Sequence, residues 1–411
     1  MPNIPFHLRS GGHIRDWNIL LFLNQSGIKP HIVYFKAGEK YSFNDDSPLC
    51  EKCSSVHFAC ERLEITDKTI TQKLKRKLSY LFPLGNEGFS FFNIEPVLYP
   101  FSYQYDAINA GDKILKYALK VKAEIVILRA FLCHNISMFQ KEGIKVIANC
   151  PDYNTHLAQE MIKTQKNPLK KIGPWLNYLG VKKQEMKYLQ LCDEIWVPTQ
   201  KEIDLMSSFI RKDKLKLFPN LIDVESYPDY SDEETEPGSL LFVGNYDYTP
   251  NLNAANLLIE KIFPAVKKEI SYAKLYLVGK GLPKDLLNRI SKDPSIIAPG
   301  FVENVLPYFK KASIFVCPVY EGAGMLLKVV EALAMGKIVI GFKESFRGIN
   351  CSIEHQNYLT ANNLVQFVFS IIEILIDKNK RMNYQSRARQ FAIKELSIKS
   401  LFLIFNKSIV T

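Results

Sequence analysis

The sequence lacks long hydrophobic runs, low-complexity tracts and a recognisable secretory signal. Its longest apolar stretch in 411 residues, Leu364–Ile376, contains Glu373, and it is shorter than the roughly 20 apolar residues that a bilayer-crossing helix needs. The N-terminal sequence MPNIPFHLRSGG has no apolar segment of the kind found in secretory signals. We therefore expect a cytoplasmic protein that does not cross a membrane.

Nucleic-acid recognition motifs are also missing, although the chain is basic. The 53 Lys and Arg residues against 42 Asp and Glu residues give a formal net charge of +11. Such a charge suits nucleic acid, an anionic membrane surface or a phosphorylated substrate. Because neither a zinc finger nor an aromatic RNP strand is present, we expect no nucleic-acid partner.

A complete zinc motif is absent from the eight cysteines. Cys50, Cys53, His57 and Cys60 have a spacing that can chelate zinc, but the second cysteine pair of a common zinc pattern is missing. The surrounding segment is strand-like, which would place His57 and Cys60 on opposite faces. We therefore expect no metal site, and we expect cysteines such as Cys317 to be reduced core residues.

The length and the composition indicate two α/β domains. A chain of 411 residues exceeds one ordinary core, and 47% apolar residues can fill two. The acidic stretch PDYSDEETEPG, residues 228–238, is typical of a linker. We expect an N-terminal acceptor-side domain over 1–227, a C-terminal nucleotide-binding domain over 239–390, and a helix over 391–411 that packs back on the N-terminal domain.

Apolar strands alternate with amphipathic helices in both halves, which predicts parallel sheets. The first half has strand patterns at His31–Phe35, Glu124–Ala130, Lys145–Cys150, Asp193–Thr199 and Lys214–Asp223. The second half has them at Leu240–Asn245, Lys274–Lys280, Ser313–Val319 and Lys337–Phe342, with SIIAPGF between the second and the third. Doubly wound sheets of this kind bind ligands at the carboxyl ends of the strands, where the strand order reverses.

The most informative segment is VCPVYEGAGMLLKVVEALAMG, Val316–Gly336. A buried strand is expected to end at Pro318, and a helix to begin near Met325, where free amides and the helix dipole suit a diphosphate. Lys328 and Glu331 are the only charged residues of this helix and share a face. Lys328 suits a phosphate and Glu331 suits ribose hydroxyls; the alternative is a Lys–Glu pair that satisfies itself.

This segment resembles the donor-binding helix of family 4 (group 1) nucleotide-sugar glycosyltransferases of the bacterial surface-glycan type. The motif G-[GA]-G-M-x-x-K-[VIL]-x-E-A-[LM]-A-x-G is present at every fixed position of 322–336. Further similar stretches are FVGNYDYTPN, GFVENVLPYFKKASIFVCP and FRGI in the second half, and SGGHIRDWNIL, CPDY, DEIWVPTQKE and FPNLIDVESY in the first. The resemblance implies a GT-B fold, in which two Rossmann-like doubly wound domains face a cleft. It also implies retaining transfer of a sugar from a nucleoside-diphosphate sugar to a glycan or lipid-linked acceptor in surface polysaccharide synthesis.

The resemblance also assigns roles to residues of this sequence. Glu331 would hold the ribose, while Lys328 and the amides of Gly324, Met325 and Leu326 would hold the diphosphate. The departing nucleoside diphosphate gathers negative charge, so cations and amides supply the main catalytic stabilisation, without a metal, a cofactor or a protein nucleophile. The other implied residues are Gly11, Gly12 and Arg15 in a loop that closes on the phosphates, Gly244 after the first strand of the second half, and Gly300, Phe301 and Val302 beside the base.

Three departures from the family pattern keep an alternative open. Ala323 stands where many relatives have a glutamate, with Glu321 out of register, and Asn245 follows Gly244 where many relatives have Arg and Lys. The short strand expected before Gly11–Gly12 is missing, which indicates either a truncated start or an impaired copy. The alternative is a catalytically inactive GT-B subunit that binds a partner transferase. A dehydrogenase is disfavoured because no G-x-G-x-x-G follows the first strand of the second half.

Two basic, partly apolar stretches, Gln72–Phe82 and Leu169–Lys183, concern the acceptor side. Lysines beside interfacial aromatics are typical of a surface that docks on an anionic membrane, and a solvated charged face is the alternative. A peripheral location at the inner membrane face would suit a lipid-linked acceptor. Arg129 and His134, which follow a strand of the first half, are the candidate acceptor residues.

Overall fold

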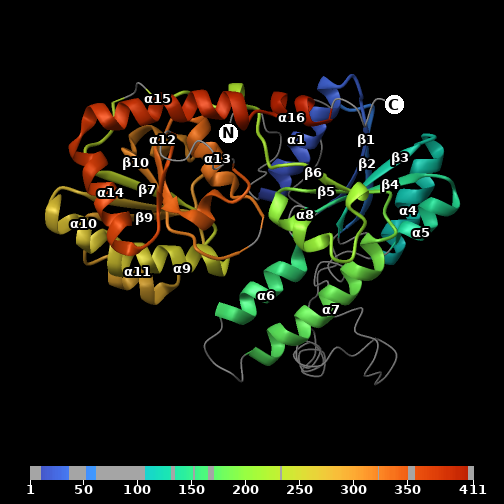
Figure 1. Ribbon diagram of the computed structural model, residues 1–411, viewed down its shortest axis with the longest axis horizontal. Coiled ribbons are helices and arrows are strands. Elements are labelled where there is room, and N and C mark those ends of the chain that lie inside the picture. The colour runs from blue at the N-terminus through green and yellow to red at the C-terminus, as the bar shows by residue number, and fades with distance from the viewer. Residues whose placement is uncertain are drawn as a thin grey trace. The chain divides into compact units, whose positions relative to one another are not determined.

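The computed structural model of the protein describes residues 11–36, 52–61, 107–130, 135–150, 153–164, 171–231, 234–322, 324–349 and 357–405. These residues form two compact units (Figure 1). The C-terminal unit takes the described residues within 1–22, 220–321 and 325–411, and the N-terminal unit takes those within 23–219 and 322–324. Both units combine parallel sheets with helices, as the alternating pattern predicts.

The C-terminal unit is built on a six-stranded parallel sheet in the order β12-β11-β10-β7-β8-β9. Its strands are β7 (Ser239–Val243), β8 (Lys274–Val278), β9 (Ile296–Gly300), β10 (Ile314–Cys317), β11 (Val339–Phe342) and β12 (Leu359–Ala361). The chain winds outward from β7 to β9 and then returns to β10 beside β7, so the sheet is doubly wound, as expected. The strand order reverses between β7 and β10, and we call the carboxyl ends of these two strands the switch point.

The helices of this unit alternate with the strands. They are α9 (Thr249–Leu257), which continues through a π-helical turn into α10 (Phe263–Glu269), then α11 (Lys284–Ile290), α12 (Leu306–Lys311), α13 (Leu327–Ala334), α14 (Leu364–Ile376), α15 (Lys378–Glu395) and α16 (Ile398–Phe405). The predicted apolar stretch is α14, whose side chains at Phe367, Ile371 and Ile374 are fully buried. No helix in the described part of the chain is long and apolar enough to span a bilayer.

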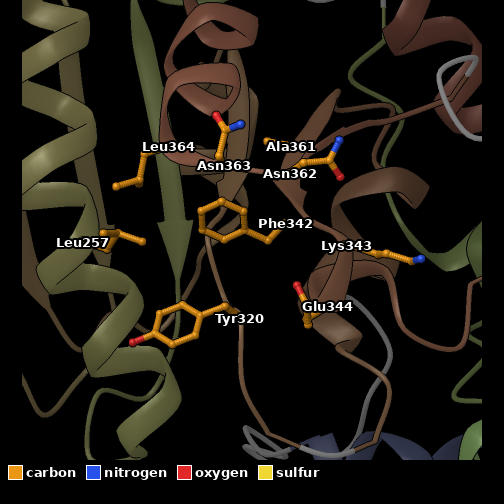
Figure 2. A pocket seen from close by; sticks show the side chains of 9 residues that line it. All are labelled: Leu257, Tyr320, Phe342, Lys343, Glu344, Ala361, Asn362, Asn363 and Leu364. Atoms are coloured by element: carbon orange, nitrogen blue, oxygen red, sulfur yellow. The ribbon is translucent and has the colours of Figure 1, made fainter. Parts of the chain in front are cut away.

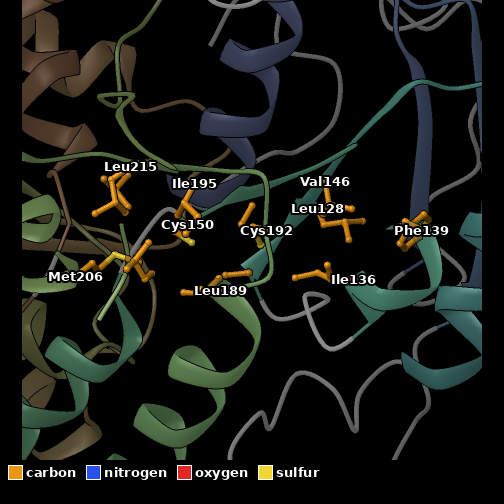
Figure 3. Close-up of a cluster of buried hydrophobic side chains, with 14 of the residues drawn as sticks. Leu128, Ile136, Phe139, Val146, Cys150, Leu189, Cys192, Ile195, Met206 and Leu215 are labelled. Carbon is orange, nitrogen blue, oxygen red and sulfur yellow. The ribbon is translucent and has the colours of Figure 1, made fainter. Parts of the chain in front are cut away.

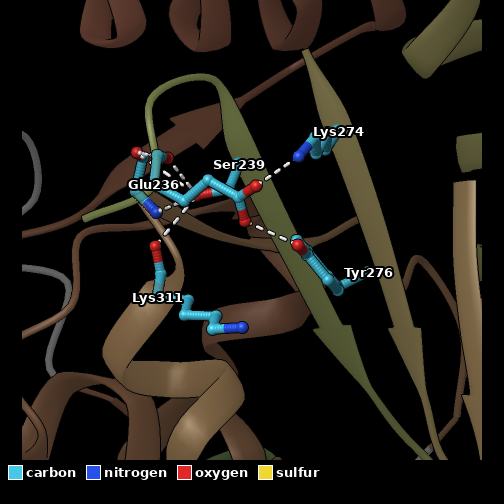
Figure 4. A network of polar contacts seen from close by, with 6 residues as sticks. Glu236, Ser239, Lys274, Tyr276 and Lys311 are labelled. Carbon is cyan, nitrogen blue, oxygen red and sulfur yellow. Dashed lines mark hydrogen bonds and ion pairs between the residues drawn. The ribbon is translucent and has the colours of Figure 1, made fainter. Parts of the chain in front are cut away.

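The acidic stretch expected to be a linker is fastened to the C-terminal unit (Figure 4). The Glu236 carboxylate accepts hydrogen bonds from Lys274 Nζ and Tyr276 Oη on β8. The Glu236 amide donates to the carbonyl of Lys311 at 2.8 Å, and Ser239 Oγ donates to the carbonyls of Glu236 and Lys311. The acidic side chain of Glu236 therefore belongs to a polar network at the start of β7.

The boundary between the units falls at Pro219–Asn220, upstream of 228–238. Ile222 forms a parallel bridge with Ser397, through hydrogen bonds from the Ile222 amide to the Leu396 carbonyl and from the Ile398 amide to the Ile222 carbonyl, both 3.0 Å. Backbone pairing holds residues after 219 in the C-terminal unit, and composition alone gives no signal for such pairing.

The N-terminal unit contains two parallel sheets. One pairs β1 (His31–Lys36) with β2 (Ser55–Glu61), and the other has the order β3-β4-β5-β6. The strands of the second sheet are β3 (Ile125–Arg129), β4 (Lys145–Asn149), β5 (Glu194–Val197) and β6 (Leu215–Leu217). Its helices are α4 (Ala107–Lys120), α5 (Ile136–Lys141), α6 (Asn154–Thr164), α7 (Ile172–Leu189) and α8 (Gln200–Met206). Their buried side chains meet in one core that includes Leu128, Phe139, Val146 and Ile195 (Figure 3).

Two local predictions differ from the structure. The expected strand Lys214–Asp223 is reduced to β6 because Pro219 cannot donate to a neighbouring strand. Gly11 and Gly12 are the first residues of α1 (Gly11–Gln25) rather than a loop before it. Gly27 follows the end of this helix and terminates it: φ is +78° there, and the Gly27 and Ile28 amides donate to the carbonyls of Asn24 and Leu23.

A carboxylate of α7 caps the N-terminus of α6 in the N-terminal unit. Glu185 accepts hydrogen bonds from the amides of Asn154 and Thr155 at 3.1 and 2.9 Å, and from both of their side chains. Burial raises the pKa of Glu185, and the hydrogen bonds from Thr155 and Asn154 oppose that shift. The acid therefore satisfies amides that a helix leaves without intrahelical partners.

We expect Glu185→Ala to lower the melting temperature by several degrees, because each buried polar group left without a partner costs about 1–3 kcal/mol. Differential scanning fluorimetry measures the change. Glu124→Ala, which removes an exposed carboxylate of the same unit, is the matched control. Equal melting temperatures for the two variants would contradict the capping role.

Candidate functional site

Lys328 lies at the switch point of the C-terminal unit. Its Nζ donates to Asn251 Oδ1 at 2.7 Å and lies 4.3 Å from the centroid of the Phe242 ring. A Cβ atom added to Gly244 would lie 3.1 Å from the same Nζ. Lys328 is the one residue of α13 that is not buried, so the first turn of α13 carries an ammonium group to the end of β7.

The hydrogen bond of the Lys328 ammonium group goes to an amide and not to an acid. Within the described residues, no carboxylate forms an ion pair with Lys328, and the self-satisfied Lys328–Glu331 pair is not formed. Burial lowers the pKa of Lys328 to about 8, partly opposed by Glu331. A cation held by a neutral amide and an aromatic face favours an anionic ligand, because the ligand would restore the solvation lost on burial.

The backbone at the start of α13 offers amides to the same region. The helix begins at Leu327 rather than at Met325, because Leu326 is extended, with φ −80° and ψ 98°. Within the described residues, the amides of Met325 and Leu326 donate to no acceptor, as the end of a helix leaves them. The Met325 carbonyl accepts a hydrogen bond from Asn220 Nδ2 at 3.3 Å, and Asn220 Oδ1 accepts one from Arg15 Nη1 at 2.6 Å. Arg15 is buried and therefore holds the backbone in place through Asn220.

Glu331 lies one turn further along α13 and is buried. Its Oε1 accepts a hydrogen bond from Tyr227 Oη at 3.2 Å, and within the described residues its Oε2 accepts none. Burial raises the pKa of Glu331 to about 7, opposed by Tyr227 and by the charge of Lys328. One carboxylate oxygen is thus anchored while the other keeps its hydrogen-bonding capacity.

Glycines bring the ends of β7, β8 and β9 close together. The Gly244 amide donates to the Val278 carbonyl, and the Gly279 amide donates to the Gly300 carbonyl, both at 3.0 Å. A Cβ atom on Gly279 would lie 1.8 Å from the Gly244 oxygen, so only glycine fits there. The sheet therefore places Gly244 and Gly300 at the same edge, and Phe301, beside Val302, is 49% exposed there.

The other predicted residues lie in the N-terminal unit or outside the described residues. The Gly324 amide donates to Glu202 Oε1 at 3.1 Å within the N-terminal unit. It therefore already has an acceptor, unlike the described amides of Met325 and Leu326. Arg129 is the last residue of β3. His134 and Ala323 lie outside the described residues. No cluster of three or more His, Cys, Asp or Glu side chains suits a metal in the described part of the chain, and Cys50 lies outside that part.

A pocket of about 430 Å³ lies elsewhere in the C-terminal unit, at the carboxyl ends of β11 and β12 (Figure 2). The rings of Tyr320 and Phe342 form part of its wall. The other lining residues are Leu257, Lys343, Glu344, Ala361, Asn362, Asn363 and Leu364. None of the residues predicted from the sequence lines this pocket, so it is separate from the switch point.

Four residues of the site lie in stretches that resemble the family, but none of them was predicted as a site residue. Asn251 was visible only as part of the FVGNYDYTPN stretch, and Asn220 and Tyr227 lie more than 90 residues from α13 along the chain. Arg347, in FRGI, donates from Nη1 to the Glu321 carbonyl at 3.2 Å. Each of them reaches the site through tertiary contacts alone.

Comparisons with known proteins agree with this fold. Residues 237–377 match the family model of Glycosyl transferases group 1. Sucrose-phosphate synthase from Thermosynechococcus elongatus is similar with a TM-score of 0.68 at 13% identity, over 97% of this chain and 92% of that one. A mutant of S. aureus TarM in complex with Fondaparinux, alpha-GlcNAc-glycerol and UDP is similar with a TM-score of 0.63 at 12% identity, over 100% and 99%. Another TarM structure has a TM-score of 0.57 at 14% identity. The match covers 74% of this chain and 59% of the length of TarM.

The likeness to these structures shows the fold, which is GT-B: mixed α/β with parallel sheets, consistent with two Rossmann-like domains. The family match covers the switch point from Gly244 to α13. No curated protein sequence matches the chain. Together, the family match and the fold support a nucleotide-sugar glycosyltransferase.

The raised pKa of Glu331 predicts a specific pH dependence of stability. Because the folded-state pKa is about 7 and the ordinary value is 4.5, the folded protein keeps a proton that the unfolded chain loses between those values. The stability contributed by this group therefore falls as the pH rises through that window. We expect the melting temperature of wild type, relative to Glu331→Gln, to be highest near about pH 5 and to decline towards about pH 8.

Glu260→Gln is the matched control, since Glu260 is exposed in the same unit. Parallel melting curves for wild type and Glu331→Gln across this pH range would show that the carboxyl group titrates as it does in water.

Proposed function

We propose that the protein is a retaining glycosyltransferase. It moves a sugar from a nucleoside-diphosphate sugar to a glycan or lipid-linked acceptor, in bacterial surface polysaccharide synthesis. The observation that carries the proposal is the partly buried Lys328, which Asn251 holds without an ion pair to any described acid, near the start of α13. The similarity to TarM supports the proposal, because that structure contains UDP.

In this proposal the diphosphate lies at the switch point and is the leaving group. The bond between the anomeric carbon and the diphosphate oxygen breaks, and its electron pair goes to that oxygen. The acceptor hydroxyl forms the new bond to the anomeric carbon and passes its proton to the departing diphosphate oxygen. Lys328 and the amides of Met325 and Leu326 stabilise the charge that collects on the leaving group. Glu331 Oε2 accepts from the ribose hydroxyls while Tyr227 holds Oε1.

The inactive-subunit alternative rests on Ala323 and on Asn245, which depart from the pattern of many relatives. The intact arrangement of Lys328, Asn251 and Glu331 favours the active enzyme, because a partly buried lysine that pairs with an amide and not with an acid costs stability. In a subunit that binds no ligand, no anion would offset the cost of the partly buried Lys328.

The acceptor side of the proposal places the N-terminal unit against an anionic membrane at the cytoplasmic face. On α7, Trp175 and Leu179 are exposed and lie one turn apart, and Lys182 and Lys183 are exposed on the next turn. Lys182 Nζ lies 5.7 Å from the Tyr178 ring. An aromatic side chain beside lysines suits the headgroup region of a membrane.

We expect Lys328→Met to weaken the binding of nucleoside diphosphates by at least about tenfold, because it removes the main charge of the diphosphate site. Isothermal titration calorimetry with UDP, GDP and ADP measures this, and also identifies the base. Lys284→Met, at an exposed lysine of the same unit, should bind as wild type does. If wild type binds none of the three nucleotides, the proposed function is wrong.

We expect the double variant Lys182→Glu, Lys183→Glu to lose binding to vesicles that contain anionic lipid, because it reverses the charge beside Trp175. Vesicle sedimentation measures the bound fraction, and neutral vesicles show whether the lipid charge matters. Lys201→Glu, Lys212→Glu makes the same charge change at exposed positions of the same unit. Equal sedimentation of the two double variants would argue against α7 as the docking surface.

A further inference from the structure

A short turn after β11 is fixed against the end of β10. The turn is the 3-10 helix η6 (Lys343–Phe346), and Arg347 follows it directly. Ser345 Oγ donates to the carbonyls of Cys317 and Val319, the latter at 2.9 Å. Because β11 and β10 are neighbours in the sheet, these bonds hold the backbone on which Arg347 stands close to the switch point.

Arg347 itself is partly buried and directed at the segment that leads to α13. Its Nη1 donates to the Glu321 carbonyl at 3.2 Å, and Gly348, with φ +82°, turns the chain away afterwards. The charge of Arg347 adds to burial in lowering the pKa of Lys328. Burial raises the pKa of the Cys317 thiol, and both Lys328 and Arg347 oppose that shift. In the structure, Lys328 lies against Phe242 on β7, and Arg347 contacts the segment that follows β10, the strand paired with β7.

We propose that Arg347 is a second cation of the diphosphate site and binds the donor's phosphates together with Lys328. This inference rests on the proposed function. Asn245 and Asp247 follow Gly244, so the end of β7 supplies no positive charge, while a sugar-bound diphosphate carries two negative charges. A guanidinium group can bind two phosphate oxygens at once.

The competing role is a structural one, in which Arg347 only supports the Glu321 carbonyl. Two variants separate these roles. Arg347→Gln keeps an N–H donor for that carbonyl and removes the charge, whereas Arg347→Lys keeps the charge and removes the planar fork. A structural role is served better by Gln, and phosphate binding is served better by Lys.

The experiment is calorimetry on the full chain with three probes: inorganic pyrophosphate, the nucleoside diphosphate that wild type binds most tightly, and the matching nucleoside. We expect Arg347→Gln to weaken both phosphate-containing probes by about tenfold or more and to leave the nucleoside unchanged. Arg347→Lys should retain most of the affinity. Arg289→Gln, at an exposed arginine paired with Glu260, controls for net charge, and melting temperatures check the fold of each variant.

Three results would overturn the inference. The first is wild-type affinity for pyrophosphate in a folded Arg347→Gln. The second is an equal loss for nucleoside and nucleoside diphosphate, which indicates a structural role. The third is the absence of any nucleotide binding by wild type, in which case the proposed function is wrong as well. If wild type binds and Arg347→Gln binds equally well, only the inference about Arg347 is wrong.

Discussion

The hydrogen bond between the Lys328 ammonium and the Asn251 amide is the constraint on which the switch point depends. A neutral amide orients the ammonium group without cancelling its charge, whereas a carboxylate at the same distance would neutralise it. The Phe242 ring beside the ammonium is fully buried and fixes its other side. The charge is therefore positioned by groups that leave it available for an anion.

The buried acids of the chain are arranged in the opposite way. Glu185 accepts from four donors at the start of α6, and Glu236 accepts from Lys274 and Tyr276 at the start of β7. Those carboxylates are satisfied within the fold and serve its stability. Glu331 differs from them, because Tyr227 occupies only one of its oxygens. Among these charged groups, only Glu331 and Lys328 keep unused hydrogen-bonding capacity within the described residues, and both lie on α13.

The sequence predicted β10 and α13 well because their signals are local. β10 is an unbroken apolar run, as a strand covered on both faces must be, and α13 has charged residues at two positions only. The start of α13 was placed two residues early because the extended backbone of Leu326 is set by its surroundings. In the acidic stretch 228–238, Glu236 pairs with β8, about 40 residues further along the chain, and composition gave no sign of this contact.

The sequence by itself determined the parallel α/β pattern, the glycine segment before α13 and the identity of the pair Lys328 and Glu331. These features depend on periodicity and on residue type, which neighbouring residues define. Only the tertiary structure decided that Lys328 pairs with Asn251 rather than with Glu331, that Tyr227 anchors Glu331, and that Arg347 donates to the Glu321 carbonyl. Hydrogen-bond partners distant in the chain are chosen by strand order and helix packing, which no local pattern encodes.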